Sequence, residues 1–242
     1  MTPLTFLNGY DKLRLLTINR LELVSMTKAV IFDLDGLLID SEVISLKMYQ
    51  RIVQDYGQTL SMATYAQEYS GKSAVTNMQH LIERFDLPFN VDTGLKRALT
   101  LEKTFMQDGV ELKPGARVLL QFLHRNHYSV ALASSSIKSR ALDILTSHDV
   151  AQYFDQFTFG PDVDRGKPYP DIFLMACAKL QQQPADCLVL EDSEAGIQAA
   201  TSAKIPVICV PDMKRPNQPY ADQATAIVPS LTDVITHLKS VR

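Results

Sequence analysis

The sequence predicts an α/β fold in which a doubly wound parallel sheet forms a core with an inserted, all-helical cap domain. Short apolar runs alternate along most of the chain with segments whose apolar residues recur at helical spacing. Strands that alternate with helices in this way form a parallel sheet with helices on both faces. One stretch, residues 43–111, shows helical spacing without a clear buried strand, and it lies between the first and second predicted strands.

The composition is that of an ordinary globular protein and excludes several other classes. Of 242 residues, 46% are hydrophobic and 21% are charged, which argues against a disordered chain, a collagen-like chain and a disulfide scaffold. Lys and Arg number 24 against 27 Asp and Glu, so the net charge is −3. This balance provides no basic field for nucleic-acid phosphates, and we expect no nucleic-acid partner.

The apolar runs and the cysteines of the sequence bear on the cellular compartment of the protein. No run of about 18 apolar residues is present, so we expect no transmembrane helix and no membrane partner. The three cysteines, Cys177, Cys187 and Cys209, are scattered and odd in number, which favours a reducing compartment. We expect a cytoplasmic protein, and a monomer as the simplest state.

Residues 1–25 precede the first predicted strand and differ from the rest of the chain. Charged and polar residues interrupt their leucines and isoleucines, whereas a secretory signal needs an uninterrupted apolar centre. We expect translation to begin at Met26, so that residues 1–25 are an extension that is not native or is disordered. The alternative is a short amphipathic interaction segment.

Five apolar runs are predicted to be the strands of the core. The first, residues 29–32, ends abruptly at Asp33 and is typical of a buried parallel strand. The others are residues 130–133, 187–190, 207–210 and 226–228. Three core helices are indicated by apolar residues at helical spacing: Val118, Leu119, Phe122 and Leu123; Ile172, Phe173, Ala176 and Leu180; and Ile197, Ala200 and Ala203.

The cap domain is predicted at residues 43–111, and the core comprises residues 26–42 and 112–242. We expect hinges near residues 40–42 and 111–115, where the chain crosses between the domains. The cap should open and close over the site and expel water from it. Three cap helices are indicated by Ile44, Met48 and Ile52; by Met78, Leu81, Ile82 and Phe85; and by Leu95, Ala98, Leu99 and Phe105.

Polar motifs stand where the predicted strands end, and ligands of open parallel sheets bind at that edge. Taken singly, each motif is typical of a loop, a turn or a helix cap. Together, and in this order, they indicate one polar site. The motifs are Asp33-Leu34-Asp35-Gly36, Ser134-Ser135-Ser136 and Glu191-Asp192-Ser193 after strands, and Gly166-Lys167-Pro168 before a helix.

The residue types in these motifs suit phosphoryl transfer. The carboxylates of Asp33, Asp35 and Asp192 are hard oxygen ligands that suit Mg²⁺, and without a cation they would repel one another. Lys167, the Ser134 hydroxyl and the backbone N–H groups of the turn that follows can hold phosphate oxygens. One carboxylate can then attack phosphorus, and a second can protonate the leaving oxygen and afterwards activate water.

The motifs resemble those of the haloacid dehalogenase superfamily, in the subclass with a helical cap after the first motif. Within it the chain is most similar to the β-phosphoglucomutase-like sugar-phosphate phosphatases. The resemblance extends over residues 27–238 and is carried by residues 30–42, 131–136, 166–171 and 190–197. It implies a Rossmann-like core, Mg²⁺ as cofactor, a small phosphorylated metabolite as partner and an aspartyl-phosphate intermediate.

The resemblance implies four residues at the metal. Asp33 would be the nucleophile and a Mg²⁺ ligand. Asp35 would be the general acid and base, with its backbone carbonyl on the metal. Asp192 would ligate Mg²⁺, and Glu191 would do so directly or through water.

The resemblance further implies that Ser134, Ser135 and Lys167 bind the transferring phosphoryl group. Family members carry a glycine and a basic residue in a cap loop that meets the substrate. Gly71 and Lys72 match this pattern, which makes Lys72 a candidate substrate contact, with an ordinary turn as the alternative.

A phosphatase and a mutase both fit the resemblance. The mutases have a cap histidine ten residues after the second aspartate, where this chain has Ser45. Because that histidine helps to prevent early activation of water, we favour a phosphatase and keep a β-phosphoglucomutase-type phosphosugar mutase as the alternative. A dehalogenase would not need Asp35, and a binding protein would be expected to lose Asp33, Asp35 or Lys167.

Overall fold

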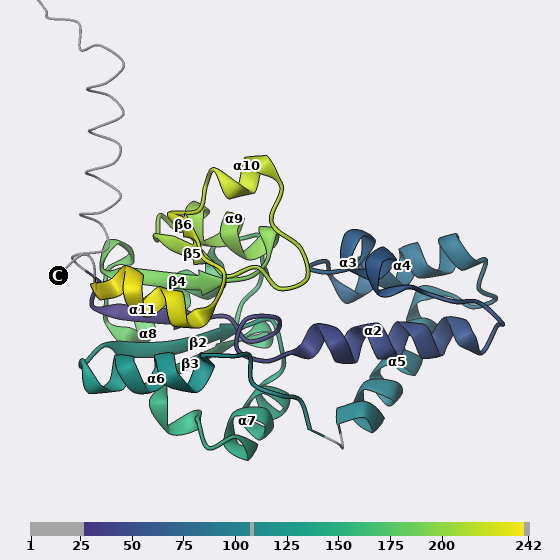
Figure 1. Ribbon diagram of the computed structural model, residues 1–242, viewed down its shortest axis with the longest axis horizontal. Coiled ribbons are helices and arrows are strands. Elements are labelled where there is room, and N and C mark those ends of the chain that lie inside the picture. Colours follow the sequence, from purple (N-terminus) through teal and green to yellow (C-terminus); the bar gives the residue numbers. More distant parts are fainter. Residues whose placement is uncertain (1–26, 107–108, 240–242) are drawn as a thin grey trace, which may run out of the picture.

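The computed structural model describes residues 27–106 and 109–239 and confirms the predicted α/β class (Figure 1). Its parallel strands form one six-stranded sheet in the order β3-β2-β1-β4-β5-β6. The expectations for residues 1–25 lie outside the described part of the chain. The strands are β1 (Ala29–Phe32), β2 (Ser129–Ser134), β3 (Gln156–Phe159), β4 (Cys187–Glu191), β5 (Val207–Cys209) and β6 (Ala226–Ile227).

The central strand β1 fixes the position of the polar motifs. Phe32 at its end lies opposite Leu132 of β2 on one side and opposite Leu190 of β4 on the other. Because the three strands run parallel, the residues that follow these partners emerge at one edge of the sheet. The strand order reverses between β1 and β4, which is where ligands of doubly wound sheets bind.

Helices cover both faces of the sheet. Val30 and Phe32 pack into a hydrophobic cluster with α6, α7 and α11, whereas Ala29 and Ile31 pack into a second cluster with α8 and α9. This division follows from the period of two along a strand. No helix of residues 27–106 and 109–239 is long and apolar enough to cross a membrane. The core helices are α6 (Ala116–Arg125), α7 (Lys138–Ser147), α8 (Asp171–Leu180), α9 (Glu194–Ser202), α10 (Gln218–Ala221) and α11 (Leu231–Lys239), with short 3-10 helices η2 (Ala151–Tyr153), η3 (Gly160–Asp162) and η4 (Pro184–Asp186).

Four helices between β1 and α6 lie beside the core and have a hydrophobic cluster of their own (Figure 1). Tyr49, Tyr65 and Tyr69 lie in this cluster, with ring centroids 5.9–6.0 Å apart. We call this unit the cap; the boundaries at residues 43 and 111 remain a prediction. Its helices are α2 (Ser41–Gln54), α3 (Met62–Glu68), α4 (Ala74–Phe85) and α5 (Val91–Phe105).

All five predicted strands are present, each within one residue at either end. The strand β3 was not predicted, because its sequence Gln156–Phe159 mixes polar and aromatic residues and offers no apolar run. Its Thr158 is nevertheless fully buried. The α-helices α3, α7, α10 and α11 were also not predicted.

The cysteines Cys177, Cys187 and Cys209 are buried and free. The reducing compartment, the cytoplasmic location and the monomeric state stay predictions.

The neighbours Val118 and Leu119 test the packing of α6. Both belong to the apolar pattern that predicted this helix, yet Val118 is 55% exposed, whereas Leu119 is fully buried. Consecutive helical residues point in different directions, so the face that carries Leu119 leaves Val118 outside.

We predict that Leu119→Ala lowers the free energy of unfolding by about 2–5 kcal/mol, and Val118→Ala by about 0.5 kcal/mol or less. Urea unfolding measures both, and equal losses would contradict this packing.

Candidate active site

Lys167 is the central cation of the polar edge of the sheet. Its Nζ lies 2.5 Å from Oδ1 of Asp33 and 2.6 Å from Oε1 of Glu191. All three side chains are buried, being 7%, 9% and 1% exposed respectively. Burial alone would lower the pKa of Lys167, but the two carboxylates outweigh it and hold that pKa above its ordinary value. The ammonium therefore stays charged and is available to an anion.

The carboxylates around Lys167 carry more negative charge than one ammonium can balance. Burial raises the pKa of Asp33 to about 7, with a contribution from Glu191, although Lys167 acts in the opposite direction. Burial likewise raises the pKa of Asp192 well above its ordinary value, and Glu191 and Asp33 raise it further. A second cation at this place would relieve the repulsion.

Glu191 organises the turn between β4 and α9. Its Oε2 accepts hydrogen bonds at 2.9 Å from the backbone N–H groups of Asp192 and Ser193 and from the Ser193 hydroxyl. Its Oε1 accepts from Lys167. A Cβ at Gly196 would overlap this carboxylate, so only glycine fits there. Since both oxygens already accept from protein donors, contact with a metal through water suits Glu191 better than direct ligation.

The donors at this edge fit a Mg²⁺ ion that retains several waters. No three His, Cys, Asp or Glu side chains are grouped as a metal site within residues 27–106 and 109–239. The expected set, however, contains the carboxylates of Asp33 and Asp192 and the backbone carbonyl of Asp35. Gly36, at a φ of +83°, makes room for Asp192, because a Cβ there would overlap that carboxylate. Mg²⁺ commonly binds through one or two carboxylates and keeps water in its remaining positions.

The phosphate-binding turn follows β2. Ser134 is 1% exposed, and its Oγ accepts the backbone N–H of Ser136 at 3.0 Å. Ser135 is exposed at the start of the loop. The Ser134 hydroxyl still has its proton to donate, and the turn holds it at the same edge as Asp33 and Lys167.

Asp35 is held by a residue that was not predicted. Oδ1 and Oδ2 of Asp35 accept from Nη2 and Nη1 of Arg140 at 2.8 and 3.0 Å, and Oδ2 also accepts from the Ser136 hydroxyl at 2.8 Å. Burial by itself would raise the pKa of Asp35, but Arg140, Ser136 and Ser41 outweigh it and leave that pKa below its ordinary value.

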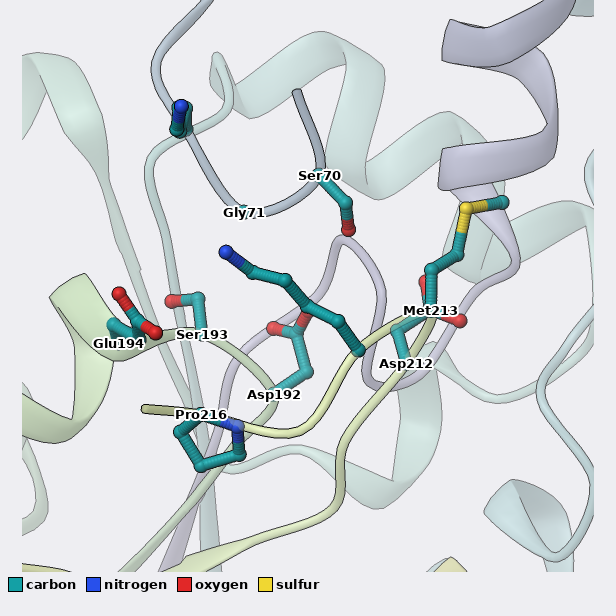
Figure 2. Close-up of a pocket in the computed structure, with 10 residues that line it drawn as sticks. Ser70, Gly71, Asp192, Ser193, Glu194, Asp212, Met213 and Pro216 are labelled. Atoms are coloured by element: carbon teal, nitrogen blue, oxygen red, sulfur yellow. The ribbon is translucent and has the colours of Figure 1, made fainter. Parts of the chain in front are cut away.

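A pocket separates the cap from the core beside Asp192. Figure 2 shows Ser70 and Gly71 of the α3–α4 loop facing Asp192 and Ser193 of the core. A Cβ at Gly71 would lie 3.8 Å from that of Ser193, so the two units approach closely there. Four further lining residues are charged: Lys72 from the cap, Glu194 at the start of α9, and Asp212 and Lys214 from the loop after β5.

Beside this pocket the chain crosses between the two units. The backbone N–H of Asp40 donates to the carbonyl of Glu111 at 2.9 Å, and that of Lys113 donates to Leu38 at 2.8 Å. The Lys113 ammonium contacts Asp212 and lies 3.5 Å from Asp40. The two predicted hinge segments are therefore bonded to each other, and their motion stays a prediction.

The model of the haloacid dehalogenase-like hydrolase family matches residues 30–210. The chain belongs to this family. A phosphorylated carbohydrates phosphatase of Thermotoga maritima is 32% identical over 178 residues, which cover 74% of this chain and 82% of that protein. Family and relative together identify this hydrolase as a phosphatase, the enzyme class that was expected.

Two solved structures of similar proteins share its architecture. One, a Thermotoga maritima protein described as a candidate beta-phosphoglucomutase, is 29% identical, has a TM-score of 0.74 and is matched over 89% of this chain and 100% of its own. The other, a HAD family hydrolase from Deinococcus radiodurans R1 with bound phosphate and sodium, is 25% identical, has a TM-score of 0.76 and is matched over 90% and 97%.

In this haloacid dehalogenase-like hydrolase the residues expected at the site lie close together, although their roles stay predictions. Lys167 joins Asp33 to Glu191, and Lys72 lines the pocket beside Asp192. Within the Gly71-Lys72-Ser73 motif, Ser73 has a structural part, because its Oγ accepts the N–H of Thr76 and caps α4. Three residues were not predicted because only the fold brings them here: Arg140, Asp212 and Lys214.

Gly36 tests whether Asp192 belongs to the metal site. We predict that Gly36→Ala displaces the Asp192 carboxylate and weakens Mg²⁺ binding by about 10-fold or more, as measured by isothermal titration calorimetry. The matched control is Gly57→Ala, because Gly57 has a φ of +73° but no atom within 4 Å of an added Cβ. That variant bears only the backbone strain and should bind Mg²⁺ like the wild type. An unchanged affinity in Gly36→Ala would contradict the role of Asp192.

Proposed function

We propose that this hydrolase is a Mg²⁺-dependent phosphatase of small phosphorylated metabolites, with a sugar phosphate as substrate and an aspartyl-phosphate intermediate at Asp33. The observation that carries the proposal is the buried Lys167 ammonium, in contact with both Asp33 and Glu191. It supplies the charge that brings a phosphate dianion beside a carboxylate. The name of the Thermotoga maritima relative supports phosphorylated carbohydrates as the substrate class.

The reaction would begin with attack of an Asp33 oxygen on phosphorus, in line with the bond to the leaving group. Lys167, the Ser134 hydroxyl and the backbone of Ser135 would hold the phosphoryl oxygens. Bound Mg²⁺ would neutralise charge on the phosphate. Asp35 would first have to leave its ion pair with Arg140 and take up a proton, which it would donate to the departing alkoxide; the carboxylate would then take a proton from the water that hydrolyses the aspartyl-phosphate.

The leaving group would lie in the pocket between the cap and the core. Ammonium groups of Lys72 and Lys214, a hydroxyl of Ser70 and the Asp212 carboxylate line this pocket. Within the described residues, Oδ2 of Asp212 is buried without a hydrogen-bond partner. Such a mixture of donors and acceptors suits a leaving group that carries several hydroxyls.

A β-phosphoglucomutase-type mutase is the second candidate, because the similar Thermotoga maritima structure is described as one. Ser45 stands where the resemblance places the histidine of the mutases, which favours hydrolysis. Incubation with β-glucose 1-phosphate distinguishes the two activities. Release of inorganic phosphate supports the phosphatase, and accumulation of glucose 6-phosphate supports the mutase.

Metal dependence is the first test of the proposed reaction. We predict that the enzyme hydrolyses p-nitrophenyl phosphate in the presence of Mg²⁺, and that excess EDTA abolishes this turnover because the phosphate and the carboxylates then repel one another. Adding Mg²⁺ beyond the EDTA should restore the rate. Absence of metal-dependent release of p-nitrophenol would instead favour a binding protein that shares the fold.

Replacement of the nucleophile is the second test. We predict that Asp33→Asn lowers kcat by about 10³-fold or more while a phosphate ester still binds, since asparagine has the same shape but is a poor nucleophile. Stopped-flow kinetics and equilibrium dialysis measure the two effects. Asp92→Asn, at an exposed position on α5, makes the same chemical change away from the site and should retain full activity. Near-normal turnover by Asp33→Asn would rule out the role of Asp33.

A further inference from the structure

The Lys167 ammonium has a third buried contact besides Asp33 and Glu191. Its Nζ lies over the ring of Phe173, 4.9 Å from the ring centroid. Phe173 is fully buried, and the Lys167 side chain is 7% exposed. A cation within about 6 Å of an aromatic centroid is attracted to the negative face of the ring, and the attraction is strongest where water is excluded. The ring therefore attracts the ammonium at a place where the attraction is at its largest.

The core of the protein fixes the position of this ring. Phe173 lies on α8, in the hydrophobic cluster that joins α8 and α9 to one face of the sheet and that includes Ile31 and Ala133. The backbone N–H of Phe173 donates to the carbonyl of Pro170 at 3.1 Å, at the start of α8. Because protein interiors are close-packed, a fully buried ring in such a cluster keeps its place.

Lys167, in contrast, lies on a loop that does not by itself fix the ammonium. Residues 164–166 and 168–169 on either side of it are exposed, whereas the end of the Lys167 side chain is buried. The place of the ammonium is thus determined by what the side chain contacts, namely the two carboxylates and the ring.

The ring differs from the carboxylates in what it demands of the ammonium. An ammonium has three N–H donors, and Asp33 and Glu191 each accept from it. The ring attracts the charge as a whole and supplies no acceptor atom. In the proposed reaction an Asp33 oxygen forms a bond to phosphorus while the bond to the leaving oxygen breaks, so Asp33 loses its negative charge. The attraction of the ring for Lys167 is unchanged by that step.

We propose that Phe173 is a positioning residue that holds the Lys167 ammonium beside the phosphoryl group, both before and after Asp33 has reacted. The inference rests on the proposed function, in which Lys167 binds the phosphoryl oxygens. Phe173 acts through Lys167 and has no contact with the substrate in this role. Because a misplacement of about 1 Å can lower a rate by about 10²-fold, weakening the hold of the ring on the ammonium should slow turnover.

The test weakens the negative face of the ring and leaves its shape nearly unchanged. Phenylalanines with one, two and three fluorine atoms (4-fluoro, 3,5-difluoro and 3,4,5-trifluoro) are incorporated at position 173, since fluorine withdraws electron density from the ring face. We expect kcat/KM for p-nitrophenyl phosphate to fall stepwise with the number of fluorines, by about 5- to 30-fold with three.

Phe154 is the matched control position. It is buried in the cluster on the opposite face of the sheet, where its ring packs edge to face on that of Phe32. The same fluorinated residues at position 154 make the same change in size and in ring electrons, away from Lys167. They should leave kcat/KM within twofold of wild type.

A leucine variant separates loss of attraction from crowding, because fluorine is slightly larger than hydrogen. Phe173→Leu removes the ring and crowds nothing, and it should lower kcat/KM at least as much as the trifluorinated ring does. Phe154→Leu makes the same substitution in the other cluster and should retain activity. Urea unfolding of the same proteins gives the fraction that is folded in the assay, and kcat/KM is referred to the folded enzyme.

The outcomes separate this inference from the proposed function. If the enzyme with the trifluorinated ring at position 173 stays within twofold of wild type, the inference is overturned and the phosphatase assignment stands. Equal losses at positions 173 and 154 show a merely structural role and overturn it as well.

A wild-type enzyme that does not hydrolyse p-nitrophenyl phosphate would refute the proposed function. The affinity for inorganic phosphate, measured by isothermal titration calorimetry with Mg²⁺, then tests Phe173 independently. Stepwise weaker binding with the number of fluorines supports its hold on Lys167, and an unchanged affinity overturns it. A wild-type protein that neither hydrolyses the ester nor binds phosphate refutes both.

Discussion

The contact of Lys167 with Asp33 and Glu191 is the interaction on which the rest of the candidate site depends. Three buried charges lie within hydrogen-bonding distance, and removing one partner of such a group leaves an uncompensated charge that destabilises a protein strongly. The Glu191 carboxylate also accepts hydrogen bonds from the backbone N–H groups of Asp192 and Ser193 and so stabilises the turn that they form. One ammonium therefore holds together the end of β1, the end of β4 and the loop before α8. The same ammonium is the charge that an incoming phosphate would meet.

Small and polar groups make part of the contact between the cap and the core, beside apolar contacts of Ile44 with the core cluster and of Met213 with the cap cluster. Gly71 approaches Ser193, Glu102 reaches Arg140, and the crossing segments share Lys113. Ion pairs and close glycine contacts can separate and re-form without exposing a large apolar area, in contrast to the aromatic cluster inside the cap itself.

A structural feature could be predicted from the sequence when a short, continuous stretch of residues determines it. Asp33 directly follows a run of four fully buried apolar residues, so the strand and the motif at its end were predictable together. Arg140 carries no such signal, because it is one polar residue on an amphipathic helix, and only the folded chain places it between Asp35 and Glu102. The strand β3 was hidden for a related reason: its burial comes from its neighbour β2 and from α8 rather than from its own composition. Val118 shows that the pattern located the helix α6 without settling which apolar residues are buried, since an apolar residue beside a buried one need not share its environment.

The bonded pair of crossing segments has a consequence for how such enzymes diversify. Asp40 bonds to Glu111, and Ile39 bridges to Leu112 in antiparallel fashion, so the insertion leaves and re-enters the core at neighbouring points. A segment with adjacent ends can be excised and replaced by an unrelated one without stretching the scaffold beneath it. Grafting a foreign helical unit at this junction would exchange the cap side of the pocket and keep Asp33, Lys167 and Asp192 in place, which makes the junction a suitable point for recombination and for engineering.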